Sequence, residues 1–131
     1  MGFEISEDTL LRVSGVGAVA YCAFAMAAPK EFTNTFMTAK AGHSDAAWRY
    51  MSICGATFGG EHLVLSAKDG NKDAKKDVLK VAGAGWLALG AHNAYNAHAG
   101  IQPKEIAVAN AIGQTALGAL CLWKGFGCDE K

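Results

Sequence analysis

The chain has 131 residues, and its twelve Lys and Arg balance twelve Asp and Glu, so its formal net charge is zero. Hydrophobic residues make up 51% of the sequence and charged residues 18%, against about 25% charged residues in an average soluble domain. The length allows one domain and the apolar content excludes an intrinsically disordered chain. Balanced charge without a basic tract argues against nucleic acid as a partner.

Four apolar blocks follow one another along the chain, and the charged residues gather between them. The blocks cover approximately residues 10–28, 46–67, 78–98 and 105–124. Each has about 18–22 residues, which as an α-helix spans roughly 30 Å, the thickness of a bilayer core. We therefore predict an all-α fold: one domain, residues 1–131, that forms a four-helix transmembrane bundle.

The first and fourth blocks give the strongest membrane signal. No charged residue lies between Val13 and Ala28, or between Ile106 and Trp123. A helix that is apolar on all sides must be buried in protein or lie in lipid. The alternative is a soluble four-helix bundle, in which each helix should have one charged face. The second and third blocks are weaker evidence for membrane spans because they contain charged residues such as Glu61.

The connections between the blocks fit a compact bundle. Residues 29–45 begin with a proline and hold scattered charges, and residues 68–77 read as a short polar turn. Gly100 and Pro103 predict the end of one helix and the start of the next. The acidic first residues of the chain are unlike a signal or transit peptide, so we expect no cleavable targeting segment.

The distribution of Lys and Arg orients the predicted bundle. Four spans place both termini and the 68–77 turn on one side, which holds eight of the twelve basic residues: Arg12, Lys68, Lys72, Lys75, Lys76, Lys80, Lys124 and Lys131. The opposite side holds the other four: Lys30, Lys40, Arg49 and Lys104. The positive-inside rule then places both termini on the cytoplasm-like side, which is stroma or matrix in an organelle.

Glycine is abundant, with 16 residues. Small residues let helices approach closely in lipid, where the hydrophobic effect no longer drives their association. Gly55 and Gly59 form a G-x-x-x-G pair in the second block, and Gly83 and Gly113 provide small residues in the third and fourth. We predict that these four glycines lie at helix contacts. The alternative is a generally alanine- and glycine-rich composition without a packing role.

Three charged residues fall in the same outer layer of the predicted membrane domain: Glu61, Arg12 and Lys80. An unpaired carboxylate is costly in lipid, so we predict a structural ion pair of Glu61 with Arg12 or Lys80. The functional alternative is a proton or ion site at Glu61, as in a small proton-linked transporter.

His62 and His92 are the histidines that lie well inside the blocks. A neutral imidazole can ligate haem iron or chlorophyll magnesium. The predicted depths of the two residues differ by roughly 10–13 Å, which is too far for both to ligate one haem. Each is a candidate ligand for its own chlorophyll or other tetrapyrrole. The alternative for each is a histidine that is hydrogen-bonded in the protein interior.

No sequence pattern indicates catalysis. The four cysteines have no C-x-x-C spacing, which leaves zinc, iron–sulfur and thioredoxin-type chemistry unsupported. The sequence contains no G-x-S-x-G, H-E-x-x-H or P-loop pattern. We therefore expect that the protein is not an enzyme and has no catalytic or metal-ligating residues apart from the two histidines.

A glycine-containing first span, the helix-ending segment Ala27-Ala28-Pro29 and an asparagine-containing third span before Gly100 resemble small four-helix membrane proteins of the DoxX-like type. This resemblance implies a four-helix membrane bundle and no settled activity. The chain's size and its alanine- and glycine-rich helices also look like small accessory subunits of organellar photosystem or respiratory complexes.

Together these observations predict a non-catalytic integral membrane subunit that packs against and stabilises a larger membrane protein complex. We expect a photosystem or another electron-transport assembly in the thylakoid or inner mitochondrial membrane, with membrane lipids around the subunit and pigment or lipid bound to it. The alternatives are a stand-alone tetrapyrrole-binding membrane protein and a small proton-linked transporter that uses Glu61.

Overall fold

The computed structural model describes residues 4–127, which form helices, turns and loops without any strand. The all-α prediction is therefore confirmed for this part of the chain. Four helices are long, and each covers one of the predicted apolar blocks: α1 (Glu7–Ala27), α3 (Asp45–Ser66), α4 (Lys72–Ala99) and α5 (Lys104–Phe126). A short helix, α2 (Pro29–Phe36), and a single 3₁₀ turn (Ala39–Ala41) lie between α1 and α3.

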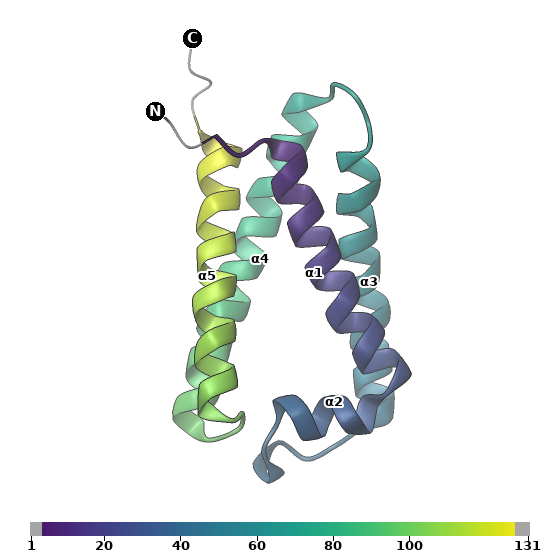
Figure 1. Ribbon diagram of the computed structural model, residues 1–131, viewed down its shortest axis with the longest axis vertical. Coiled ribbons are helices and arrows are strands. Elements are labelled where there is room, and N and C mark those ends of the chain that lie inside the picture. The colour runs from purple at the N-terminus through teal and green to yellow at the C-terminus, as the bar shows by residue number, and fades with distance from the viewer. Residues whose placement is uncertain (1–3, 128–131) are drawn as a thin grey trace.

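The long helices form two antiparallel pairs, α1 with α3 and α4 with α5 (Figure 1). Contacts within each pair are far more extensive than contacts between the pairs. The start of α1, the α3–α4 turn and the end of α5 lie together at what we call the terminal end (Figure 1). The short helix α2 and the α4–α5 turn lie at the opposite end, which we call the loop end.

Local side-chain chemistry sets the helix ends. Ser6 caps α1 by accepting a hydrogen bond from the Thr9 backbone N–H at 3.1 Å, and Ser44 caps α3 in the same way from Ala47 at 3.2 Å. Helix α4 ends at Gly100, which has the left-handed φ of 72° that favours glycine. The predicted helix stop at Gly100 is therefore confirmed.

Two connections differ from the prediction. Helix α4 begins at Lys72, so most of the charged run at residues 68–77 is helical and the turn is short. The run from Lys72 to Asp77 contains no glycine or proline and several good helix formers, whereas Gly70 and Asn71 just before it have positive φ values. The connection at residues 29–45 contains α2, which starts at Pro29, a residue that suits the first position of a helix.

Glycine brings the backbones of α1 and α3 into contact. A Cβ atom added at Gly59 would lie 2.7 Å from the Gly15 carbonyl oxygen, and one added at Gly15 would lie 2.7 Å from the Gly59 carbonyl oxygen. Gly55 faces the Cys22 sulfur with no room for a Cβ atom. This is the close approach that small residues permit between helices in membranes.

The α4–α5 pair repeats this arrangement with Gly83 and Gly118. An added Cβ on each would lie 2.8 Å and 2.9 Å, respectively, from the carbonyl oxygen of the other. Gly113, which we predicted at a helix contact, instead has no heavy atom within 4 Å of an added Cβ. Gly113 precedes Gly118 by five residues, which turns it about 140° away from the contact face.

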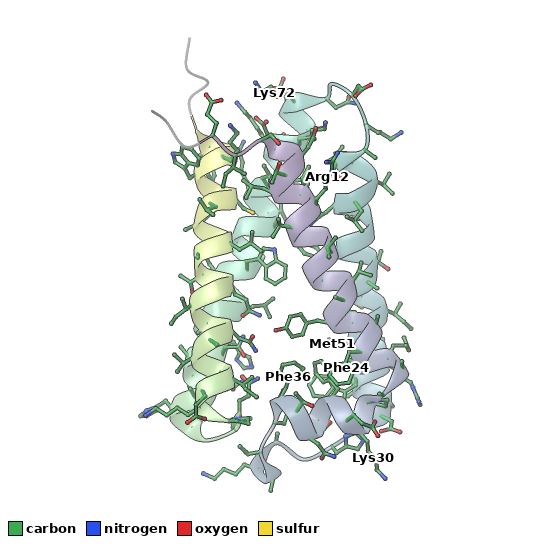
Figure 2. The ribbon with its side chains drawn as sticks, in the orientation of Figure 1. Arg12, Phe24, Lys30, Phe36, Met51 and Lys72 are labelled. Atoms are coloured by element: carbon green, nitrogen blue, oxygen red, sulfur yellow. The ribbon has the colours of Figure 1, made fainter. Side chains whose placement is uncertain are left out.

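An aromatic cluster fixes α2 across the loop end of the α1–α3 pair. Its members are Tyr21, Phe24, Phe32, Phe36 and Trp48. The Phe32 ring lies 4.8 Å from Trp48, 5.4 Å from Phe24 and 4.7 Å from Phe36, measured between ring centroids. Figure 2 shows Phe24 and Phe36 at this end, far from Arg12 and Lys72 at the terminal end. Helix α2 is therefore held by large aromatic side chains, whereas the long helices of each pair meet backbone to backbone at glycines.

Candidate functional site

A buried polar network joins the two helix pairs inside the molecule. The Trp86 Nε1–H of α4 donates to Ser14 Oγ of α1 at 2.7 Å, and Ser14 Oγ lies 2.8 Å from His62 Nδ1 of α3. Tryptophan can only donate, so Ser14 Oγ accepts the bond from Trp86, and the direction of the bond between Ser14 and His62 depends on the histidine tautomer.

The network surrounds His62 with protein side chains. The side chain is 2% exposed, its Nδ1 is occupied by Ser14, and its ring packs edge-on against Phe58 at 4.1 Å. The structure thus places His62 between packed helices, where its contacts are those of a hydrogen-bonded interior histidine. The sequence did not reveal its partners, because Ser14 and Trp86 lie on other helices and are distant along the chain.

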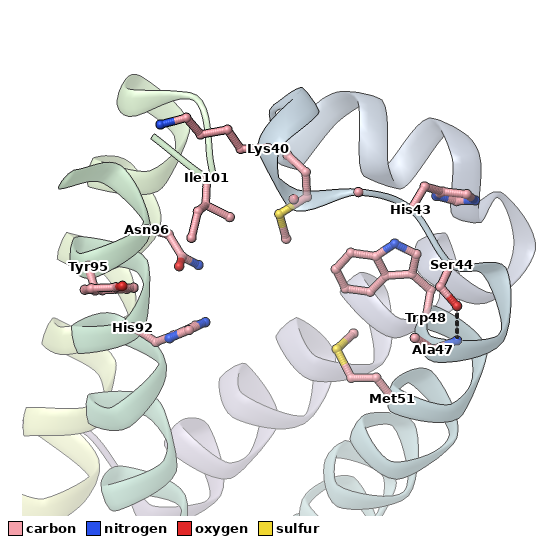
Figure 3. Close-up of a pocket in the computed structure, with 13 residues that line it drawn as sticks. Lys40, His43, Ser44, Ala47, Trp48, Met51, His92, Tyr95, Asn96 and Ile101 are labelled. Carbon is pink, nitrogen blue, oxygen red and sulfur yellow. Dashed lines mark hydrogen bonds between the residues drawn. The ribbon is translucent and has the colours of Figure 1, made fainter. Parts of the chain in front are cut away.

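An open hollow of about 830 Å³ lies at the loop end, between the two helix pairs. Its walls are the 37–44 segment, the first two turns of α3, the last two turns of α4 and Ile101 (Figure 3). The hollow exists because the chain between α1 and α3 bridges the two pairs at this end. Thr38 makes this bridge by donating its hydroxyl to the Gly100 carbonyl at 2.6 Å and its N–H to the Ile101 carbonyl at 2.8 Å.

His92 is the candidate site residue that the structure brings to this hollow. It projects from α4 toward Trp48 and Met51 on the opposite wall (Figure 3). Its ring stacks on Tyr95 of the same helix with centroids 6.4 Å apart. Among the described residues it has no hydrogen-bond partner, in contrast to His62. One imidazole nitrogen of His92 can therefore serve as a ligand.

Hydrogen bonds hold both walls of the hollow in place. On the α3 side, Trp48 Nε1–H donates to Thr33 Oγ1 at 2.7 Å, and Thr33 Oγ1 lies 2.6 Å from His43 Nδ1. The other ring nitrogen of His43 pairs with Asp45. On the α4 side, the buried Asn96 side chain donates to Gln102 Oε1 at 3.1 Å. These bonds orient the Trp48 ring and anchor the start of the α4–α5 turn.

The predicted ion pair of Glu61 with Arg12 or Lys80 is wrong. Lys80 Nζ instead bonds the Asp77 carboxylate at 2.8 Å, one turn earlier on α4. Among the described residues, neither Arg12 nor Glu61 takes part in an ion pair, and both side chains are exposed. The prediction rests on depth in the membrane alone, which does not say whether a side chain faces a neighbouring helix or the outside of the bundle.

A different ion pair closes the terminal end. The Lys75 side chain, 6% exposed, places Nζ 2.7 Å from Asp8 Oδ1 and 2.5 Å from the Lys68 carbonyl oxygen. It thereby ties the start of α1 to α4 and to the α3–α4 turn. Amide side chains make two further links between helices: Asn93 of α4 donates to Gln114 of α5, and Asn110 of α5 accepts from the Tyr21 hydroxyl of α1 at 2.9 Å.

Among residues 4–127, no group of three or more His, Cys, Asp and Glu side chains is arranged to hold a metal ion by itself. Comparison of the chain with known protein families, curated proteins and solved structures finds no match. The likeness to DoxX-like proteins and to organellar accessory subunits therefore stays a prediction from the sequence.

Proposed function

We propose that the chain is an integral membrane protein whose four long helices all cross the bilayer, and that it serves as a non-catalytic subunit of a larger membrane complex. The observation that carries the membrane placement is the distribution of side chains. Small and polar residues such as Ser14, Ser52 and His62 fill much of the interior beside a few leucine and aromatic side chains, while many large apolar residues point outward. A soluble bundle has the reverse arrangement.

Helices α1 and α5 are each long and apolar enough to cross a membrane. Only 39% of the most apolar stretch of α1 and 17% of that of α5 is buried within the molecule. The core helix of a soluble protein is mostly buried, because its apolar surface must leave water. The outward faces of α1 and α5, with Val16 58% exposed and Ile112 67% exposed, therefore favour contact with lipid.

Helices α3 and α4 are less apolar, and packing explains the difference. Each is the antiparallel partner of a strongly apolar helix along its length, so it would cross the bilayer together with that partner (Figure 1). Several of their polar residues, including His62 and Asn93, face the interior. Their outward faces carry apolar residues such as Ile53, 60% exposed, and Leu89, 47% exposed.

Aromatic residues near the helix ends support the same placement. Trp123 and Phe126 are 55% and 69% exposed at the terminal end, and Tyr50 and Tyr95 are 75% and 59% exposed near the loop end. Tryptophan and tyrosine are enriched where membranes meet water, because their rings combine an apolar body with a polar group. A helix of the length of α5 spans about 34 Å, which matches the distance between two such interfaces.

The outward charges support a partner subunit. Glu61 lies five residues from the end of α3, about 7 Å within a membrane-spanning helix. It is exposed and has no ion-pair partner among the described residues. A charged residue in a membrane segment normally pairs or faces protein. A basic side chain of another subunit would satisfy Glu61, so we propose the α1–α3 face around it as the surface that joins the complex.

Two measurements test this proposal. After alkaline extraction of membranes, an integral protein stays in the pellet, whereas a soluble or peripheral protein is released. On native gels of detergent-solubilised source membranes, we expect the chain to migrate with a larger assembly, and Glu61→Lys to reduce that fraction while Glu4→Lys, at the chain's start, leaves it unchanged. Release by alkali, or migration of the native chain only near its own mass, would contradict the proposal.

A further inference from the structure

We propose that the loop-end hollow binds an anionic metallotetrapyrrole of the haem type, with His92 as the axial ligand to the metal and Lys40 beside the carboxylates of the tetrapyrrole. This inference deepens the proposed function, since it assigns a cofactor class to one end of the membrane subunit. It rests on the membrane placement only for the orientation of the ligand.

The size and lining of the hollow suit a planar apolar macrocycle. Its volume of about 830 Å³ falls within the range of roughly 300–1,000 Å³ that is typical of small-molecule and cofactor sites. The wall opposite His92 presents the Trp48 indole and the Met51 thioether (Figure 3). An aromatic ring and a polarizable thioether both pack well against the face of a large aromatic ring system.

His92 is placed and poised for axial ligation. It projects into the hollow from α4, a regular helix that fixes the position of its backbone, and its ring lies within 23° of parallel to the Tyr95 ring. The His92 side chain is exposed, and neither of its ring nitrogens has a hydrogen-bond partner within residues 4–127. A metal centre in the hollow would supply that partner, as the proximal histidine of haem proteins shows.

The other histidines of the chain are less suited to this role. His43 lines the hollow, but both of its ring nitrogens are engaged, by Thr33 and Asp45. His62 is buried between helices and bonded to Ser14. His98 is exposed on α4 and is not part of the lining. The assignment therefore falls on His92, and His98 provides a matched control on the same helix.

Lys40 gives the ligand its orientation and its charge. It lies at the rim of the hollow on the loop-end side, where the proposed bilayer meets water (Figure 3). Its Nζ is 3.4 Å from the Ala99 carbonyl oxygen, at the end of α4. Haem carries its carboxylates on one edge, so this edge would lie at Lys40 and the apolar edge would point into the membrane. Chlorophyll has no free carboxylate for Lys40, which favours the haem type.

The test is a titration of the purified full-length chain in detergent micelles with hemin, followed by the Soret absorption band. We expect saturable binding with a shifted Soret band, and His92→Ala should weaken it by at least about tenfold, which corresponds to a loss of about 1.4 kcal/mol. Added imidazole should restore the Soret position in His92→Ala. The control His98→Ala should bind like the native chain, and circular dichroism should show that both variants fold.

A second variant tests the proposed contact between Lys40 and the carboxylates of the tetrapyrrole. Lys40→Gln should weaken the binding of hemin severalfold but leave the binding of hemin dimethyl ester, which lacks free carboxylates, unchanged. Three results would each overturn the inference: no hemin binding by the folded chain, binding that is unaffected by His92→Ala, or tighter binding of a magnesium or zinc tetrapyrrole ester than of hemin. Failure of the membrane proposal would show separately, as release by alkali.

Discussion

At the terminal end the two helix pairs are joined by side chains that cross from one pair to the other, while at the loop end the pairs stand apart around an open hollow. Asp8 bonds Lys75 across the terminal end, and Leu10, Leu11, Leu79 and Cys121 form a buried cluster there. The loop end is filled by the aromatic cluster, which packs within the α1–α3 side. Small and aliphatic residues thus hold the two helix pairs together at the terminal end. At the loop end the aromatic rings pack against one pair only, and a hollow remains between the pairs.

The difference between the two ends indicates which residues should determine stability and which should determine ligand binding. Side chains at the closed end and along the glycine contacts are buried, so substitutions there should change the free energy of unfolding. Most residues that line the hollow are exposed, including Met51, which is 42% exposed, so substitutions there should affect a ligand more than the fold. Three pairs of variants test this contrast between the two ends.

The largest expected effect is at the glycine contact of α1 and α3. Gly59→Leu would drive a side chain into the Gly15 carbonyl, which lies 2.7 Å from an added Cβ, so we expect a loss of at least about 3 kcal/mol in unfolding free energy. Gly60→Leu is the matched control, because no heavy atom lies within 4 Å of its added Cβ. The unfolding free energy of both variants is measured in mixed micelles as the fraction of denaturing detergent is raised. Equal effects would show that α1 and α3 do not meet at Gly59.

A smaller effect is expected in the buried polar network. Ser14→Ala removes the partner of both Trp86 and His62, which should cost about 2–3 kcal/mol. Ser52→Ala is the control, because Ser52 is 1% exposed and its hydroxyl has no hydrogen-bond partner, so its removal should be neutral or stabilising. The same unfolding measurement decides. A Ser14→Ala protein as stable as Ser52→Ala would mean that the network does not hold the pairs together.

The smallest effect is expected from the ion pair at the terminal end. Asp8→Asn leaves the Lys75 ammonium buried without its carboxylate, and because Asp8 itself is 39% exposed we expect a loss of about 1–2 kcal/mol. Asp77→Asn removes a comparable pair with Lys80 on the surface, where Asp77 is 73% exposed, and should cost less than about 0.5 kcal/mol. Hydrogen exchange of the first turn of α1 gives a local readout. Equal protection in the two variants would contradict the role of Asp8.

The sequence allowed the helices to be predicted, because their determinants are local. Apolar runs of sufficient length located all four long helices, and Gly100 located the end of α4. Gly55, Gly59 and Gly83 do lie at helix contacts, whereas Gly113 does not, since a composition signal cannot say which face of a helix meets its neighbour.

The arrangement of the helices and the hollow could not be predicted, because they depend on contacts between distant residues. Trp48 falls in the second apolar block and Lys40 in the polar connection before it, and nothing in the sequence predicts that both lie opposite His92, where the bridge through Thr38 brings them. The predicted pairing of Glu61 with Arg12 or Lys80 rests on depth in the membrane, but Glu61 and Arg12 are exposed and Lys80 pairs with Asp77. The depth of a residue in the membrane follows from its position in the chain, whereas the direction of its side chain follows from how the helices pack.

The central claim is that the outer surface of this bundle faces lipid. To test it, the native cysteines are replaced by alanine and the chain is reconstituted in vesicles. Single spin labels then go on the outward face of each long helix, at Val16, Ile53, Leu89 or Ile112. The collision rates of each label with oxygen, which partitions into lipid, and with a water-soluble nickel complex are then compared. Four labels accessible to oxygen and shielded from nickel are the predicted result. Nickel access at Ile53 or Leu89 would show that α3 or α4 faces water and would contradict the four-helix membrane bundle.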